Sequence, residues 1–353
     1  MKRLTRPSNT QPSAAGLAAL AVVGGVIYLW RVMLSTERVK AKPDTDAFVG
    51  RVVWSPIKSL WFNFHLLAAI FLAPFVVSLS SVGVFILLTG ITLCFGHSLG
   101  MHRLLIHRSY ECPKWMEYLF VYLGTLVGMA GPIGMMKQHD LRDWAQRQTH
   151  CHDYLLHGSS ILKDGWWQLN CDLELKNGPD FFIEDSVWYD PFYRFIEKTW
   201  MCQQLALALP LYWFGGLSWV VWGISVRIVV SVGGHWLIGY FAHNRGERTW
   251  RVDGAAVQGH NIRLAGLLSM GEAWHNNHHA YPGSAMLGLY KDEPDPGWWV
   301  LNALHNLGIV KNIQLPRDLP PRSELVSESI DLEKRVERVP EDCEIAKFIR
   351  GNR

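Results

Sequence analysis

The chain has 353 residues, of which 49% are hydrophobic and only 18% are charged, and this balance excludes an ordinary soluble protein. Its net charge of +3 is too small to indicate a nucleic-acid-binding protein. The six cysteines contain no CxxC pair, which excludes a disulfide framework and a zinc ribbon. The informative features are the 17 tryptophans, a residue type that favours the membrane–water interface, and the clustering of the 15 histidines.

The N-terminal segment, residues 1–57, starts with basic and polar residues and continues into an uncharged apolar run, Ala14–Trp30. This run is at the short limit for a helix that crosses a bilayer. A signal peptide has a similar pattern, but a basic stretch, Arg31–Lys42, stands where a cleavage site of small residues would be needed. We therefore expect either a membrane anchor or a helix that lies on the membrane surface.

Two longer apolar blocks predict two transmembrane hairpins. Ser59–Met101 contains no charged residue and is long enough for two spans of about 20 residues each. Trp200–Gly234 is similar, with a bend expected at Gly215–Gly216. Its only charged residue is Arg227, which should face a partner or a polar cavity, or extend toward the interface.

The charged residues beside the first hairpin set its orientation. Arg51 and Lys58 precede the hairpin, and Arg103 and Arg108 follow it. Basic loops remain in the cytoplasm, so both ends of the hairpin should be cytoplasmic. We predict an all-α integral membrane protein with about four spans and possibly an extra N-terminal helix. The membrane domain is 58–315, and a charged cytosolic tail follows at 316–353. All histidine-rich segments then meet in one cytosolic helical cap.

The densest histidine cluster lies in Gly271–Pro282, GEAWHNNHHAYP, and contains His275, His278 and His279. Positions i, i+3 and i+4 share one face of a helix. Three imidazoles on one face suit iron, zinc or copper. The alternative is a polar helix end, but three buried rings would each need a hydrogen-bond partner.

Three further clusters contribute histidines. The first holds His97, His102 and His107, the second His139, His150, His152 and His157, and the third His235 and His243. His102 and His107 would diverge by about 140° on a regular α-helix, which suits two neighbouring metals or an unwound helix. Eight or nine imidazoles exceed the four ligands of one zinc ion and suit two metals with open positions. Nearby carboxylates that could orient the rings are Asp140, Asp143, Asp153 and Glu272.

These motifs resemble the membrane fatty acid desaturase family, of the acyl-CoA (stearoyl-CoA) type, over roughly Lys58–Leu315. His102–Tyr110 resembles the first histidine box, of HxxxxH form, and His275–His279 the third, of HxxHH form. The segment around His243 resembles the one that supplies a further ligand. The order of hairpins and boxes also agrees. The second box departs from HxxHH, as in a divergent bacterial branch: counted from Trp144, only His152 matches.

The resemblance implies a histidine-ligated di-iron centre. The expected metal ligands are His102, His107, His139, His152, His157, His243, His275, His278 and His279. His150 competes for a place in the altered box. The family also places Asn four residues before the isolated ligand, where this chain has Gly239.

The implied function is O2-dependent desaturation of a long fatty acyl chain, as acyl-CoA or acyl-lipid. The centre would contain two iron ions and lie on the cytoplasmic side of a membrane, the inner or plasma membrane in a bacterium. A separate ferredoxin-like or cytochrome-like donor with its reductase would supply electrons, and membrane lipid would surround the spans. Three alternatives stay open: a di-iron hydroxylase of a lipid or alkyl substrate, a membrane zinc hydrolase, and an inactive metal-binding relative.

Overall fold

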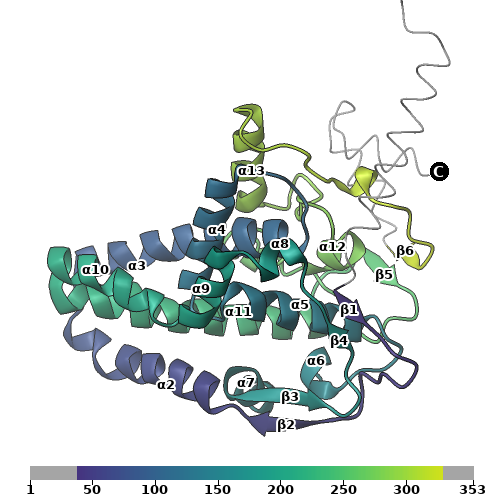
Figure 1. Ribbon diagram of the computed structural model, residues 1–353, viewed down its shortest axis with the longest axis horizontal. Helices are drawn as coiled ribbons and strands as arrows, with labels where there is room; N and C mark the ends of the chain where they lie inside the picture. Colours follow the sequence, from purple (N-terminus) through teal and green to yellow (C-terminus); the bar gives the residue numbers. More distant parts are fainter. Residues whose placement is uncertain (1–37, 329–353) are drawn as a thin grey trace, which may run out of the picture. The chain divides into compact units, whose positions relative to one another are not determined.

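The computed structural model describes residues 38–328. The expected anchor at Ala14–Trp30 and the part of the tail after residue 328 therefore lie outside the described residues. Residues 39–328 form one unit that is mostly helical (Figure 1). The helical fold class is thereby confirmed.

The first apolar block forms a helical hairpin. Helix α2 (Pro56–Phe71) ends in a short 3-10 turn, η1 (Ala73–Phe75), and helix α3 (Leu79–Ile91) continues into the π-helix η2 (Thr92–Ile106). Ser78 caps α3, because its hydroxyl accepts a hydrogen bond from the amide of Ser81 at 3.1 Å. Pro56–Phe75 and Leu79–Ile106 are each long and apolar enough to cross a membrane.

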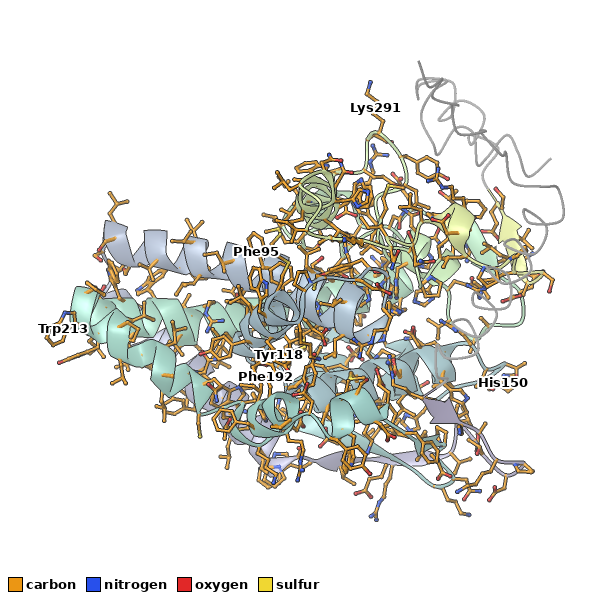
Figure 2. The ribbon with its side chains drawn as sticks, turned by 45° about the horizontal axis from the view of Figure 1, so that its top comes forward. Phe95, Tyr118, His150, Phe192, Trp213 and Lys291 are labelled. Atoms are coloured by element: carbon orange, nitrogen blue, oxygen red, sulfur yellow. The ribbon has the colours of Figure 1, made fainter. Side chains whose placement is uncertain are left out.

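The second apolar block forms the third candidate span, Gln203–Asn244. It comprises helix α10 (Gln203–Val220), a short π-helix, η3 (Val221–Val226), and helix α11 (Arg227–Asn244). Gly216 interrupts this segment with φ 60° and ψ −156°, a backbone conformation that only glycine adopts readily. The break lies at the bend predicted from Gly215–Gly216, and Trp213, just before it, marks the far end of the helices in Figure 2.

The two bends are joined to each other by hydrogen bonds. Ser218 Oγ donates to the carbonyl of Val76 at 2.6 Å and lies 3.2 Å from Ser78 Oγ. Trp222 Nε1 donates to the carbonyl of Ala73 at 3.1 Å. Helices α2, α3, α10 and α11 accordingly extend in the same direction from the rest of the unit (Figure 1). Their outward side chains are apolar and exposed, as expected for contact with lipid.

Arg227 is fully buried within the second block, and its guanidinium bonds to uncharged groups. Nε donates to the carbonyl of Gly223 at 2.7 Å, Nη2 to Gln204 Oε1 at 2.7 Å, and Nη1 to the carbonyl of Leu126. Of the two expectations for this residue, the structure shows a polar interior partner, not extension toward the interface.

The remaining elements form the cap that surrounds the histidines, at the right and centre of Figure 1. Three short antiparallel ladders, not predicted from the sequence, join distant segments. The ladders are β1 (Val39–Lys40) with β4 (Asp180–Phe181), β2 (Gly50–Trp54) with β3 (Cys171–Leu175), and β5 (Trp250–Val252) with β6 (Leu325–Ser327). The helices are α4 (Lys114–Leu126), α5 (Pro132–Gln146), α6 (Asp153–Leu156), α7 (Ile161–Asn170), α8 (Asp185–Trp188), α9 (Pro191–Thr199), α12 (His275–Ala280) and α13 (Pro296–Asn306), with 3-10 turns η4 (Arg263–Ala265) and η5 (Pro316–Asp318).

Candidate metal centre

Four histidines from three separate segments converge in one group. His102 comes from η2, His107 directly follows η2, His139 lies on α5 and His278 on α12. One nitrogen of each ring lies within 4.8 Å of one nitrogen of every other ring. All four were predicted as ligands. The Nε2 atoms of His102 and His107 lie 3.2 Å apart.

The π-helix explains how a five-residue spacing brings His102 and His107 together. In a π-helix each amide bonds to the carbonyl five residues earlier, so positions i and i+5 lie one above the other. The amide of His107 bonds in this way to the carbonyl of His102 at 3.0 Å. The divergence expected on an α-helix is therefore removed, and both rings point at the same place.

A second group contains three histidines, all of them predicted ligands: His243 near the end of α11, and His275 and His279 on α12. The Nε2 atom of His275 lies 3.0 Å from that of His243 and 3.1 Å from that of His279. A ring nitrogen carries either a proton or a lone pair, so this one atom cannot form good hydrogen bonds to both neighbours. Three nitrogens that converge in this way are better explained by a shared cation.

The donor set fits a transition-metal ion in each group. Two nitrogens that bind one ion at about 2.1 Å lie about 3.0–3.4 Å apart, which matches the distance between His102 and His107 and the two distances from His275 to its neighbours. Burial, together with the neighbouring imidazoles, holds the pKa values of His275 and His278 well below the usual range, and the pKa of His279 falls to about 4. The rings are therefore neutral at pH 7, with lone pairs available to a metal.

Glu272 orients one ring of the four-histidine group, that of His102, by contacting its Nδ1 atom. Its Oε2 lies 2.7 Å from Nδ1 of His102, and its Oε1 accepts a hydrogen bond from Ser98 Oγ at 2.6 Å. Burial alone would raise the pKa of Glu272, but His102 and the Arg103 guanidinium hold it well below its usual range. The carboxylate is thus ionised and fixes the His102 tautomer, with Nε2 facing the group. The role predicted for Glu272 matches this geometry.

The two asparagines inside HNNHH fix the short helix α12. Asn276 Oδ1 accepts from the amides of Thr249 and Trp250 at 2.8 and 2.9 Å. Asn277 Nδ2 donates to Glu293 Oε2 and to the carbonyl of Leu287, both at 2.8 Å. Both asparagines are buried, so each polar atom needs these partners. Sequence reasoning assigned them no role, although their place between ligands was a usable signal.

Within residues 38–328, two of the nine predicted ligands lie outside both groups. His152 precedes α6, and its Nδ1 accepts a hydrogen bond from the amide of Tyr154 at 3.1 Å. His157 stacks on His243, with ring centroids 5.2 Å apart, but both its nitrogens are engaged. Arg142 Nη1 lies 2.9 Å from Nε2, and Asp164 Oδ2 lies 2.9 Å from Nδ1. Arginine only donates, so Nε2 accepts and Nδ1–H donates to Asp164.

The count from Trp144 placed the second box at Gln148, Cys151 and His152, whereas the structure places Arg142 and Asp143 after His139 on α5. Helix α5 ends at Gln146, so the count from Trp144 continued beyond the helix. Counted from His139, the i+3 and i+4 positions are Arg142 and Asp143. The signal that could have found them is the identical spacing of His275, His278 and His279. His150, the competitor, is exposed and lies apart from both groups.

Two more histidines border the four-histidine group. His97 packs edge to face against His235, with ring centroids 5.0 Å apart, and stacks on His102 at 6.4 Å. His97 lies on η2 and His235 on α11, so the pair joins the two apolar blocks beside the four-histidine group. Neither residue was predicted as a ligand, and neither lies in the two groups.

No protein-family model matches the chain as a whole or in part. Curated relatives do match over most of its length. The chain is 33% identical to an sn-2 palmitoyl-lipid 9-desaturase of Nostoc sp. (strain 36), over 71% of this chain and 86% of that protein. It is 35% identical to an sn-1 stearoyl-lipid 9-desaturase of Anabaena variabilis, over 73% and 93%. It is 32% identical to an icosanoyl-CoA 5-desaturase of Limnanthes douglasii, over 72% and 70%.

Proposed function

This chain belongs to the fatty acyl desaturase family and is an oxidoreductase that desaturates a fatty acyl chain, and we propose that it does so through two iron ions and O2. The observation that carries the proposal is the convergence of seven imidazoles into two neighbouring groups. His275 and His278, whose ring centroids are 5.7 Å apart, belong to different groups, so the two positions are adjacent. An imidazole-rich pair of sites suits iron and oxygen chemistry.

The substrate has no acidic proton and no electrophilic carbon, so side-chain acids and bases alone cannot activate it. The iron pair would supply the oxidising power that breaks unactivated C–H bonds. The protein's own residues have other tasks. The four- and three-histidine groups hold the ions, Glu272 fixes the ring of His102, and the buried asparagines keep α12 rigid. The reacting carbons must be held at one place beside these groups while water is excluded.

The proposed reaction removes one hydrogen from each of two adjacent carbons and forms a double bond. The two hydrogens, two further protons and two electrons convert O2 into two waters. We propose that the electrons come from a separate ferredoxin-like or cytochrome-like protein with its reductase. The relatives act on acyl groups carried by lipids or by coenzyme A, and we propose one of these carriers here.

We further propose that residues 38–328 span the membrane four times, apart from the possible N-terminal helix. The break at Gly216 divides the third candidate span into two arms, and the hydrogen bonds between Ser218, Ser78 and Val76 hold the two bends at one end of the bundle. With both bends at one end, the histidine groups belong to the opposite side. Basic flanking residues support a cytoplasmic location for that side.

The test is expression in a host that lacks the activity, followed by fatty-acid profiling by mass spectrometry. The wild-type protein should yield a product two mass units lighter than the saturated chain, and His278→Ala, which removes a ligand of the four-histidine group, should yield none. The purified wild-type protein should hold about two iron ions per chain with coupled Mössbauer spectra. A product sixteen mass units heavier would indicate hydroxylation, and stoichiometric zinc would contradict the di-iron proposal.

A further inference from the structure

We propose that His157 is a positioning residue for the three-histidine group, and that it acts by holding the ring of His243. The sequence predicted His157 as a ligand, and the structure of residues 38–328 places it outside both groups. This inference rests on the proposed function, because it concerns how the chain orients a ligand of one ion. It gives His157 a role that neither the relatives' names nor the histidine motifs indicate.

The ring of His157 covers one face of the His243 ring. The two rings are nearly parallel, at 9°, and their centroids are 5.2 Å apart, which is an offset arrangement that aromatic rings prefer. His275 and His279 approach the His243 ring at steep angles, 88° and 62°. Of these three neighbouring imidazoles, His157 is therefore the one that lies flat on His243 and limits the rotation of its ring.

The orientation of the His243 ring decides where its free nitrogen points. Nδ1 donates a hydrogen bond to the carbonyl of Gly239 at 2.7 Å, because a carbonyl oxygen only accepts. Nε2 is then the atom with the available lone pair, and it lies 3.0 Å from Nε2 of His275. A rotation of the ring would move this nitrogen away from the other two histidines of the group, so the flat contact with His157 preserves their convergence.

The ring of His157 is itself held by two charged residues, one at each nitrogen. Arg142 Nη1 donates to Nε2 at 2.9 Å, and Nδ1 donates to Asp164 Oδ2 at 2.9 Å. Asp164 is 0% exposed and also accepts a hydrogen bond from Trp236 Nε1 at 2.8 Å. Because both nitrogens are occupied, the ring has no lone pair free for a metal, and its plane is fixed against His243.

A glycine on α11 leaves room for this ring. A Cβ atom added at Gly239 would lie 3.5 Å from Nε2 and 3.8 Å from Cε1 of His157, which is ordinary van der Waals contact. A longer side chain would extend from this Cβ atom into the space that the ring occupies. Gly239 therefore supports His243 in two ways, through its carbonyl group and through the space that it leaves for His157.

The experiment measures the affinity of each group for Co²⁺ in the purified, metal-free full-length protein, by visible absorption in competition with a calibrated chelator. Two reference variants, His107→Ala and His243→Ala, identify the absorption bands of the four- and three-histidine groups. His157→Ala should lower the affinity of the three-histidine group by about 10–100-fold, the usual effect of losing a residue that orients a ligand. The affinity of the four-histidine group and the shapes of all bands should not change.

Further variants separate the ring from the fold around it. His157→Gln keeps a hydrogen-bonding partner for Arg142 and for Asp164, so the protein should fold, but it lacks the flat ring and should match His157→Ala. Gly239→Leu should displace the ring and lower the same affinity. Gly233→Leu is its control on the same helix, because nothing lies within 4 Å of a Cβ atom there. His150→Ala removes an exposed histidine and should match the wild type.

Three results would overturn the inference. An unchanged affinity in His157→Gln would show that the ring is not needed. An equal loss of affinity at both groups would indicate a general loss of structure. A change of band shape like that in His243→Ala would make His157 a ligand. Failure of the proposed function would be visible separately, since the wild type itself would then bind fewer than two Co²⁺ ions.

Discussion

At the scale of single residues, Glu272 connects the four-histidine group to the buried residues around it. One oxygen contacts His102, and the other accepts from Ser98 and lies 3.8 Å from Arg103 Nε. Arg103 is itself 1% exposed and bonds to Asp295 at 2.7 Å. A change in the charge of Glu272 therefore affects both the orientation of one ligand and the neutralisation of a buried cation.

Glu272→Gln should weaken metal binding at the four-histidine group. The amide keeps the size of the side chain but removes the negative charge that supports the His102 ring and part of the compensation for Arg103. Loss of such an orienting partner typically lowers metal affinity by about 10–100-fold. Competition with a calibrated chelator measures this affinity. Asp292→Asn, which removes an exposed charge, is the control, and an unchanged affinity in Glu272→Gln would show that hydrogen bonding alone orients His102.

Residue patterns predicted which histidines converge where the local helix is regular. His275, His278 and His279 follow an α-helical spacing, and all three enter the groups as expected. The residues of the altered second box were harder to assign from the sequence. No spacing rule shows that α5 ends at Gln146, before His152. The role of Arg142 depended on a contact with His157, fifteen positions away, which only tertiary structure supplies.

At the scale of elements, two glycines let the π-helix η2 pack directly against α4. A Cβ atom added at Gly96 would lie 2.4 Å from the backbone nitrogen of Gly124, and one added at Gly100 would lie 2.5 Å from the backbone of Phe120. The four-residue spacing of these glycines is the arrangement that permits close helix contact in membranes. The position of η2 matters because His102 and the preceding His97 are carried on it.

Gly100→Ala should destabilise the protein by about 1–3 kcal/mol, because the new methyl group can be accommodated only if the backbone of η2 or α4 moves. The same displacement should lower the iron content, since His102 would shift relative to His139 and His278. Thermal unfolding in detergent and iron analysis measure both effects.

Gly90→Ala is the matched control for this change. Gly90 lies in the same continuous helical segment, but a Cβ atom there would meet nothing within 4 Å. Alanine should be tolerated or slightly stabilising at that position, because it favours helix over glycine. Equal stability losses in Gly90→Ala and Gly100→Ala would contradict the close-packing argument.

The apolar blocks were predictable as elements, whereas their internal irregularities were not. Length and absence of charge identified Ser59–Met101 as a hairpin, and paired glycines located the bend before Leu217. The π-helical turns of η2 depend on how η2 packs against α4, and composition does not report this. The ladder of Gly50–Trp54 with Cys171–Leu175 joins segments more than a hundred residues apart, and neither segment alone specifies its partner.

At the scale of the whole described unit, the molecule has an apolar end and a polar end that carries the two histidine groups. Trp213 lies near the bend of the second block and is 84% exposed, while Lys291 is an exposed residue of the cap, and Figure 2 shows the two far apart. The histidines of the two groups come from η2, α5, α11 and α12 and the residue after η2, so all of these segments must have their histidine-bearing ends on the same side of a bilayer. Moving the charged cap across hydrocarbon would be very costly.

This polarity predicts the sidedness of the protein, which single-cysteine labelling can measure. In a background without the six native cysteines, Trp213→Cys and Lys291→Cys provide one thiol at each end. A membrane-impermeant maleimide should label Trp213→Cys in intact cells and Lys291→Cys only after the membrane is opened, because basic flanks keep the cap in the cytoplasm. Labelling of both thiols from the same side would contradict two complete hairpins, because an even number of crossings, and not one, would then separate the bend from the cap. The reversed pattern would still agree with two hairpins. It would place the histidine groups, and the surface that the proposed electron donor contacts, on the outer side of the membrane.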